Sequence, residues 1–444
     1  MKRLNRLLIA VVLVAIVLTT WVLVFGAQSD SAKQATLIAQ AAEYTRRGIF
    51  FDAAPLLEEA AGYDTARTAE VERLLKDVYL ELIDKGGFRQ KYIDLLGMQM
   101  RRPTATFEVF HELASFYFGG SRYEDAFDIL KDGIARTGSD ELVVLYEANR
   151  YIYRIGYNSY EDVTAISGST IGVCNDELWG VATSKGELFI PCEYERISTF
   201  SAGRAFVQRS GEIFAVDSAN NRRALLLWDE DGFPGQVSEF GNYANDRLTL
   251  KIDGKWYRAT GSLVFRTKPF DWIGMHSDSH AAVIHEGKWG VIDLEANLVI
   301  PAEYDGIIMD ELGRCYRQGA VFVRQGGAVH LLADGERVGD AYDDAKPFGV
   351  EGYAAVKKNG LWGFIDTSGE VVIPYQFEDA QSFGQHLAAV RVGEFWGYIS
   401  LGGKIVIEPE FLQAKGFGNG SAPVLTERGW RFITLIQYME GASL

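Results

Sequence analysis

The chain has 444 residues, 48% of them hydrophobic, and a formal net charge of −16 at pH 7. A chain of this length holds roughly two or three domains and can bury large cores. Its acidic balance excludes nucleic acid as an expected partner, because an acidic surface repels the phosphate backbone. Most of the charge lies in residues 161–444, which carry 25 basic and 39 acidic residues, a balance of −14.

The first thirty residues combine a short basic flank, Lys2 to Arg6, with an uncharged run of 21 residues, Leu7–Ala27. A membrane-spanning helix needs about 20 apolar residues, whereas the apolar core of a cleaved signal is roughly 7 to 15. The length favours a transmembrane anchor over residues 1–30, with a cleaved signal as the alternative. Because the positive flank stays in the cytoplasm, we expect a single-pass protein of the inner (cytoplasmic) membrane whose bulk faces the periplasm or the exterior.

Residues 31–160 follow the helical period of 3.6. The stretch TFEVFHELASFYFGGSRYEDAFDILKDGIARTGSD predicts two helices joined by a Gly-Gly-Ser turn. Its apolar and small residues stand at the spacing of a tetratricopeptide (TPR) repeat, at Phe110, Leu113, Ala114, Tyr117, Tyr123, Ala126, Leu130 and Gly133. The segment resembles TPR proteins, and the resemblance implies a TPR-like helical domain that binds a protein partner in a groove. The alternative is a helical spacer that lifts the next domain from the membrane.

The resemblance also implies which side chains would line that groove. In TPR repeats these are first-helix residues that do not serve the packing positions. We take Val144, Ala148 and Tyr151 as the packing residues of the helix that follows the best-matched repeat. The candidate partner-binding residues are then His111, Ser115, Phe118, Leu145, Asn149 and Ile152. This uncharged mixture of apolar and hydrogen-bonding groups suits an extended peptide or a helix.

Gly, Asn, Ser and Thr break the helical pattern near residues 161–170, which we expect to be a linker. From residue 171 to 436 the sequence repeats around tryptophans and Trp-Gly pairs, at Trp179-Gly180, Trp256, Trp289-Gly290, Trp362-Gly363, Trp396-Gly397 and Trp430. With Ile213 and Ala328 at the Trp position of degenerate copies, the steps are 34, 43, 33, 39, 34, 34 and 34 residues, which gives eight units. A recurring period of roughly 20 to 50 residues is the signature of a repeat architecture.

Each unit predicts short strands, as in YAAVKK, LWGFID and VVIP, separated by turns that contain Gly or Ser. One Trp per unit at constant register is typical of a stacked core, and we prefer that interpretation to a sugar-binding stripe. Neighbouring units must stack to bury their faces. Eight such units can close as a propeller or run as an open solenoid, and we favour the propeller. Residues 437–444 form a tail.

The stretches GKWGVIDLEANLVIPAEYD and KKNGLWGFIDTSGEVVIPYQFED match the consensus of the bacterial WG (KWG) repeat family nearly throughout. Residues 171–436 resemble this family, with departures in the second, third and fifth units. The resemblance implies an all-β repeat domain of the kind frequent in envelope or secreted bacterial proteins. It implies no reaction and no agreed ligand.

Few residues suggest chemistry. His276, His280 and His285 share one stretch and could hold a metal, but His285 continues a strand and we expect an ordinary polar loop. Cys174 and Cys192 fall in one unit on either side of a central strand, so the sequence leaves their bonding open. No GxSxG elbow, HExxH pair or phosphate-binding Gly loop appears. We therefore expect no enzyme activity, no metal and no cofactor.

The sequence predicts a multidomain α and β protein. It has an N-terminal transmembrane helix, TPR-like α-helical repeats and an all-β WG-repeat domain, propeller-like or a β-solenoid. The expected function is non-catalytic binding or scaffolding of other envelope proteins through the TPR-like and WG-repeat surfaces. The alternative is a glycan- or peptidoglycan-binding module of the cell envelope.

Overall fold

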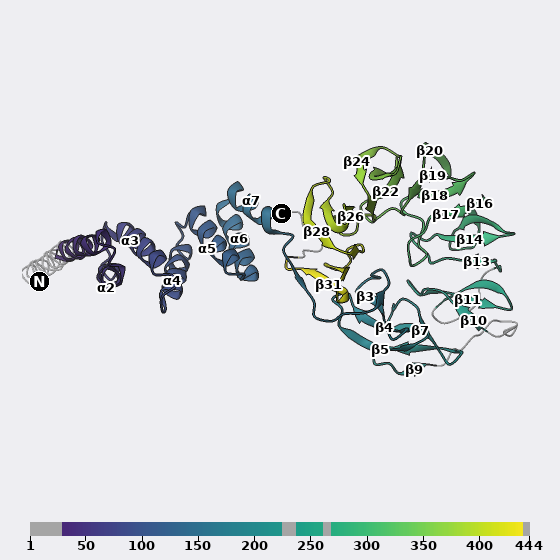
Figure 1. Ribbon diagram of the computed structural model, residues 1–444, viewed down its shortest axis with the longest axis horizontal. Helices are drawn as coiled ribbons and strands as arrows, with labels where there is room; N and C mark the ends of the chain where they lie inside the picture. Colours follow the sequence, from purple (N-terminus) through teal and green to yellow (C-terminus); the bar gives the residue numbers. More distant parts are fainter. Residues whose placement is uncertain (1–28, 224–236, 261–267, 438–444) are drawn as a thin grey trace, which may run out of the picture. The chain divides into compact units, whose positions relative to one another are not determined.

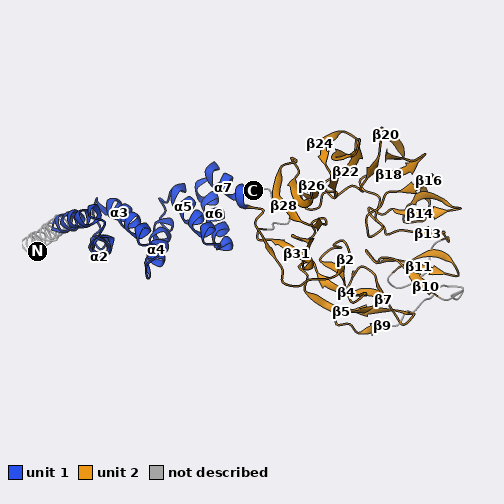
Figure 2. Cartoon of the chain, in the orientation of Figure 1, with its two compact units in different colours: residues 1–149 blue, residues 150–444 orange. Residues whose placement is uncertain are grey.

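The computed structural model describes residues 29–223, 237–260 and 268–437. The chain divides into a helical unit, Met1–Asn149, and a β unit, Arg150–Leu444 (Figure 2). Within the described residues, no helix is both long and apolar enough to cross a membrane. The predicted transmembrane segment, Leu7–Ala27, lies outside the described residues.

The helical unit is a succession of short helices (Figure 1). After helical residues 29–46 come α2 (Phe50–Ala61), α3 (Thr68–Glu81), α4 (Phe88–Met100), α5 (Phe107–Gly119), α6 (Tyr123–Thr137) and α7 (Asp140–Asn149). Gly138 ends α6 in the left-handed conformation, with φ at 63°, and its N–H donates to the carbonyl of Ile134. The boundaries confirm the helix pair predicted for α5 and α6.

The packing of α5 against α6 follows the predicted positions. Phe110, Ala114, Ala126 and Leu130 are fully buried. A Cβ added at Gly133 would lie 2.8 Å from Cγ of Phe110, so the lack of a side chain on α6 allows this close approach.

The register predicted for α7 is wrong. Leu142 and Tyr146 are its buried residues, whereas Val144 and Ala148, assigned as packing residues, are exposed. The helix is short, and its apolar residues Leu142 to Leu145 are consecutive. A run of this kind is compatible with more than one buried face, so periodicity alone does not fix which side packs.

The β unit is an eight-bladed β-propeller (Figure 1). Each complete blade is a four-stranded antiparallel sheet, and the third blade has three strands among the described residues. The first blade contains β2 (Asp162–Val163), β3 (Thr170–Asn175), β4 (Leu178–Thr183) and β5 (Leu188–Tyr194), and the second contains β6 (Arg196–Ile197), β7 (Arg204–Arg209), β8 (Glu212–Asp217) and β9 (Arg222–Arg223). The third contains β10 (Val237–Phe240), β11 (Arg247–Ile252) and β12 (Lys255–Thr260), and the fourth contains β13 (Trp272–Ile273), β14 (Ala281–His285), β15 (Lys288–Ile292) and β16 (Leu298–Tyr304). The fifth blade contains β17 (Gly306–Ile307), β18 (Ala320–Gln325), β19 (Ala328–Ala333) and β20 (Glu336–Tyr342), and the sixth contains β21 (Asp344–Ala345), β22 (Tyr353–Lys358), β23 (Leu361–Asp366) and β24 (Val371–Phe377). The seventh contains β25 (Asp379–Ala380), β26 (Leu387–Val392), β27 (Phe395–Ser400) and β28 (Ile405–Phe411), and the eighth contains β29 (Gln413–Ala414), β30 (Ser421–Thr426), β31 (Gly429–Leu435) and β1 (Tyr153–Ile155).

The ring is closed by a strand from the beginning of the β unit. β1 pairs with β31, with Tyr153 opposite Leu435 and Ile155 opposite Ile433, and so becomes the fourth strand of the eighth blade. The guanidinium of Arg431 donates two hydrogen bonds to the carbonyl of Gly156, at 2.9 and 2.6 Å. The repeat is therefore a closed propeller and not an open solenoid.

The β unit also begins earlier than we expected. It starts at Arg150 rather than residue 171. Residues 161–170, expected to be a linker, contain β2, the whole of the loop that follows it and the first residue of β3. A three-residue strand and a two-residue strand carry too little alternation for a pattern of polar and apolar residues to reveal them.

The eight repeat units coincide with the eight blades. The third strand of each blade carries the Trp position of the repeat, from Trp179 on β4 to Trp430 on β31. In four blades an aromatic residue 15 positions later lies directly opposite this Trp on the fourth strand, as in Trp362 and Phe377. Four tryptophans are at most 7% exposed, and Trp179 and Trp289 are half-buried. The predicted core role of the tryptophans is confirmed for Trp256, Trp362, Trp396 and Trp430.

The glycine of the Trp-Gly pair is required by a β-bulge in the fourth strand. Trp362 faces Phe377 while Phe364 faces Ile373, so the register shifts between them and the outer strand approaches Gly363. A Cβ added at Gly363 would lie 2.8 Å from the carbonyl oxygen of Ile373. The equivalent distances are 2.4, 2.7 and 2.5 Å at Gly180, Gly290 and Gly397.

We expect Gly363→Ala to lower the free energy of unfolding of the β unit by about 1–3 kcal/mol, because the added methyl group collides with backbone atoms that cannot rotate away. The control is Gly402→Ala, where an added Cβ would have no atom within 4 Å. Urea titration followed by tryptophan fluorescence measures both. Equal stability of the two variants would contradict the bulge as the reason for the glycine.

Candidate functional site

The loops that join the first and second strands of the blades gather at the centre of the ring, whereas β5, β9, β20 and β24 lie at its rim (Figure 1). We call them the inner loops. They are residues 164–169, 198–203, 241–246, 274–280, 308–319, 346–352, 381–386 and 415–420. Seven of them contain six or seven residues, and the inner loop of the fifth blade contains twelve. This longer loop is the main departure from the repeat at the centre of the ring.

Most inner loops insert an aromatic ring against the preceding blade. Phe383 lies 4.9 Å from Phe364 between ring centroids, and Phe417 lies 4.8 Å from Tyr398. Tyr243 and Phe348 make the same kind of contact with Phe206 and Phe322. These aromatic pairs fasten neighbouring blades together.

A glycine after the aromatic lets adjacent inner loops touch. An added Cβ would lie 2.1 Å from the carbonyl oxygen of Phe383 at Gly349, and 2.4 Å from that of Phe417 at Gly384. The loop tips are also bonded in sequence around the ring: for example, Oε1 of Gln385 accepts a hydrogen bond from the N–H of Gly420 at 2.7 Å. The inner loops are therefore rigidly supported by one another.

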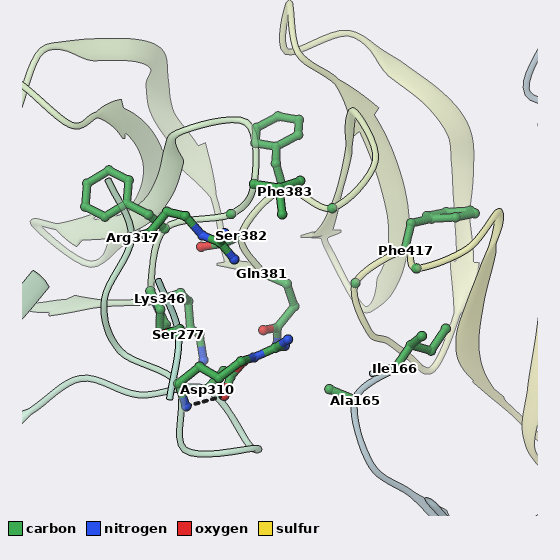
Figure 3. A pocket seen from close by; sticks show the side chains of 18 of the residues that line it. Ala165, Ile166, Ser277, Asp310, Arg317, Lys346, Gln381, Ser382, Phe383 and Phe417 are labelled. Carbon is green, nitrogen blue, oxygen red and sulfur yellow. Dashed lines mark hydrogen bonds and ion pairs between the residues drawn. The ribbon is translucent and has the colours of Figure 1, made fainter. Parts of the chain in front are cut away.

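A cavity of about 730 Å³ opens between the inner loops of six blades, the first and the fourth to eighth. Figure 3 shows Arg317, Lys346 and Asp310 on one side of it, and Ala165 and Ile166 on the opposite side. One wall is thus charged and the other apolar. The volume falls within the range of roughly 300–1,000 Å³ that is usual for ligand pockets.

Most of the charges in the cavity are paired. Nε of Arg314 lies 2.6 Å from a carboxylate oxygen of Asp310, and Nζ of Lys415 lies 2.6 and 2.7 Å from the two carboxylate oxygens of Glu311. Nζ of Lys346 instead lies 5.5 Å from the ring centroid of Trp362.

The long inner loop of the fifth blade crosses the centre of the ring. Its Glu311 reaches Lys415 in the eighth blade, and its Leu312 carbonyl accepts a hydrogen bond from Nδ2 of Asn242 in the third blade at 2.9 Å. Burial raises the pKa of Cys315 in the same loop to about 12, so this thiol is not ionised at neutral pH. The loop shapes the cavity and supplies one or both partners of the Arg314–Asp310 and Lys415–Glu311 ion pairs.

The predicted groove residues do not all lie in one unit. His111, Ser115, Phe118, Leu145 and Asn149 belong to the helical unit, and Ile152 belongs to the β unit. Phe118 packs edge-on against Phe127, with ring centroids 5.2 Å apart, so part of its surface serves the α5–α6 contact. Nδ2 of Asn149 donates to the carbonyl of Leu145. Partner binding by this surface stays a prediction.

The sequence did not reveal the cavity. The sequence held two signals of it. A Phe stands 21 residues after the Trp in three units, at Phe200, Phe383 and Phe417, and the repeat that starts at Trp289 is longer than most, at 39 residues. Which loop ends face the centre of the ring depends on strand order, which the repeat pattern does not specify.

The histidines and cysteines with possible chemistry are dispersed. His280 stacks on Tyr316 at 4.0 Å, whereas His285 contacts Phe270. In the part of the chain that the structure describes, no group of three or more His, Cys, Asp or Glu could hold a metal. Cys174 and Cys192 are free thiols.

The sequence of the β unit was compared with models of known families. Five stretches match the model of the WG containing repeat. They are residues 179–212, 289–327, 341–362, 362–394 and 396–430. In the structure four of these WG stretches begin on the third strand of a blade and run into the next blade, and the stretch 341–362 begins at the end of β20 and runs to β23.

Comparison with curated proteins gave no match. Among solved structures, the chain is similar to PorZ, a surface component of the type-IX secretion system of Porphyromonas gingivalis, at 12% identity and a TM-score of 0.32 over 55% of this chain. The match spans 37% of the PorZ chain. YCF48 from Cyanidioschyzon merolae matches at 12% identity and a TM-score of 0.34, over 64% of this chain and 98% of its own. The extracellular domain of a hybrid two component system of B. thetaiotaomicron matches at 10% identity and a TM-score of 0.36, over 59% and 44%.

The junction of the third and fourth blades departs from the aromatic pattern. His276 stands at the inner-loop position held by Phe383 in its blade, and Arg258 stands two residues after the blade's Trp, as Phe364 does. Both are buried, and Nη1 of Arg258 lies 3.0 Å from Nε2 of His276. Burial, and then the charge of Arg258, lower the pKa of His276 to about 3. A buried polar pair thus replaces an aromatic contact.

This junction predicts an acid-sensitive fold. Unfolding releases His276 to its ordinary pKa of 6.5, so the unfolded state takes up the proton first as the pH falls. The stabilising effect is complete above pH 6.5 and is lost progressively toward the folded pKa of about 3. At pH 5 the loss amounts to about 2 kcal/mol.

We expect His276→Phe to remove that part of the pH dependence and His285→Phe to keep it. Urea titrations at pH 7.5 and pH 5 measure the difference. A wild-type chain and a His276→Phe variant that lose equal stability between the two pH values would contradict the assignment.

Proposed function

We propose that this protein is a non-catalytic binding protein of the cell envelope, and that the central cavity of the propeller holds a segment of a protein partner. The observation that carries the proposal is the cavity itself, built from inner loops of six blades. Those loops are fixed by aromatic contacts and tip-to-tip hydrogen bonds. Preorganised walls of this kind lower the entropy lost on binding.

The state of the ionisable groups supports binding rather than chemistry. The carboxylates of Asp310 and Glu311 are each held in an ion pair, and the thiol of Cys315 stays protonated. A general base or a nucleophile needs a group that is poised to accept a proton or to attack. The cavity offers donors, acceptors and apolar surface.

A glycan ligand fits the cavity less well. Sugars stack on exposed aromatic faces, but Phe348, Phe383 and Phe417 are each at most 6% exposed. Tyr316 is covered by the ring of His280. The aromatic rings of the lining therefore serve contacts within the protein.

The helical unit supports a second binding surface. The close α5–α6 contact, with the buried small residues Ala114, Ala126 and Gly133, is the arrangement found in TPR repeats. We propose that the unit is TPR-like and that its candidate groove residues on α5, His111, Ser115 and Phe118, bind a protein partner. The uncharged segment Leu7–Ala27, which lies outside the described residues, would anchor both units to the inner membrane with their bulk on the periplasmic or exterior side.

We expect Gln381→Trp to fill the cavity and abolish capture of the partner by the propeller. Gln381 lines the cavity, and Figure 3 shows its side chain between the charged and the apolar wall. The matched control is Val371→Trp, because Val371 is 51% exposed on the outer strand β24. Crosslinking in intact cells, followed by mass spectrometry, identifies the partner that the wild type and the control retain. Equal capture by a folded Gln381→Trp protein would remove the cavity from the proposal.

A second prediction separates the helical unit from the propeller. Ser115→Arg places a long cation in the proposed groove and should abolish capture of a partner that the helical unit binds. Ser115 is partly exposed, so we expect the fold to remain intact. Thr104→Arg, in an exposed turn, makes the same change of charge outside the groove. If Ser115→Arg and Thr104→Arg capture equal amounts, the groove is not the binding surface.

A further inference from the structure

We propose that the cavity recognises a carboxylate of the bound peptide through Lys346, and that Glu311 is an internal competitor that occupies the second such position at Lys415. The inference rests on the proposed function, because it names the chemical class of the segment that the cavity holds. The predicted ligand is an acidic side chain flanked by apolar residues.

The charge of the cavity differs in sign from that of the surrounding unit. Four basic residues and two acidic residues line it, Arg314, Arg317, Lys346, Lys415, Asp310 and Glu311, a balance of +2. Two carboxylates lie just outside the lining: Asp278 pairs with Arg317 at 3.0 Å, and Glu351 accepts a hydrogen bond from the N–H of His386 at 2.6 Å. Residues 161–444 together carry −14. The positive charge is therefore confined to the lining itself, where a small anionic group can reach it and a large anionic surface cannot.

The remaining positive charge belongs to Lys346. Within the described residues, no carboxylate lies at ion-pair distance from its ammonium group, which lies 5.5 Å from the ring centroid of Trp362. A partly buried ammonium without a carboxylate gains from an incoming anion, because a charge-assisted hydrogen bond is stronger where water is excluded. Lys346 is therefore the residue at which an acidic ligand has most to gain.

Lys415 shows what such a lysine can hold. Lys346 and Lys415 stand at the same position of the repeat, directly after β21 and β29, and each ammonium lies above the Trp of its own blade, at 5.5 and 5.2 Å. Lys415 also binds both carboxylate oxygens of Glu311. Two lysines at equivalent positions, each above a Trp ring, thus differ in one respect: Lys415 binds a carboxylate, and Lys346 is free to bind one.

Glu311 reaches Lys415 only because the inner loop of the fifth blade has twelve residues. An inner loop of ordinary length would leave two lysines, two blades apart, facing one cavity. The loop thereby lowers the affinity of Lys415 for acidic ligands and leaves the affinity of Lys346 unchanged. Because only the position at Lys346 stays open, the cavity favours a ligand with one carboxylate over a polyanion.

The apolar wall identifies a peptide as the source of that carboxylate. Ile166 in this wall is partly exposed, and Val350, in the inner loop that carries Lys346, is 57% exposed. Apolar side chains on either side of an acidic residue would contact Ile166 and Val350 while the carboxylate reaches Lys346. A free inorganic anion would leave the wall exposed to water, with no gain from its burial.

The test uses the full chain, immobilised in detergent, and two libraries of acetylated, amidated hexapeptides. The libraries have equal composition except that one has Glu fixed at the third position and the other has Gln. We expect about tenfold greater retention of the Glu library at low salt, as one charge-assisted contact would give. Mass spectrometry of the eluted peptides measures the ratio.

The variants assign the preference to residues. Lys346→Gln should abolish the preference, and Lys404→Gln should keep it, because Lys404 is exposed and lies outside the lining. Glu311→Gln should raise retention of the Glu library, since it frees Lys415; this gain of binding tests the inference independently of any loss of folding at Lys346.

The outcomes separate the inference from the proposed function. Equal retention of the two libraries overturns the carboxylate assignment and leaves peptide binding in place. Retention of neither library overturns peptide binding by the cavity, and the assignment with it. A preference that Lys404→Gln abolishes as fully as Lys346→Gln does would show a general effect of charge and would also overturn the assignment.

Discussion

The whole β unit depends on closing the ring, because a blade buries its faces only against two neighbours. Seven blades are each built from strands that follow one another along the chain, whereas the last blade ends at β31 and has no consecutive fourth strand. The three residues of β1 complete it. Arg431, Gly156 and the paired backbones of Tyr160 and Trp430 extend this seam toward the first blade. The inner loops, the cavity between them and the fixed positions of its charged side chains all presuppose this closure.

Much of the propeller could be predicted because the repeated residues make the same local contacts in each blade. Trp362 and Phe377 face each other across two strands, and Gly363 makes room for the bulge between them, so their spacing along the chain is fixed by the fold. The sequence could not show β1 or the centre of the ring. Pairing of Tyr153 with Leu435 joins residues from opposite ends of the unit. Convergence of Lys346 and Lys415 depends on how the blades are arranged in a circle, which no single repeat contains.

Part of the acidic charge of the β unit has a structural role in its turns. In five blades, an acidic residue that precedes or begins the first strand accepts a hydrogen bond from the backbone N–H of the turn between the second and third strands. The bonds join Glu161 to Asp176, Glu195 to Ser210, Asp271 to Gly287, Asp305 to Gly326 and Asp343 to Gly360. A carboxylate satisfies a turn donor that no strand can reach. This device accounts for five of the 39 acidic residues in the range 161–444, and it implies no cationic partner for them.

This use of the acidic residues separates the charges of the propeller by location. The turns that the carboxylates support connect the second and third strands, whereas the inner loops leave the opposite ends of the second strands. Basic residues can therefore line the cavity of an acidic unit, because the carboxylates that bind the turns lie at the other ends of the second strands, away from the lysines of the cavity. Among the residues that the structure describes, Glu311 alone pairs with one of these lysines, and it does so from the inner loop that departs from the repeated length. Variation of an inner loop alters the cavity while the Trp-Gly bulges and the turns stay unchanged, so the same ring can be adapted to different ligands without loss of its fold.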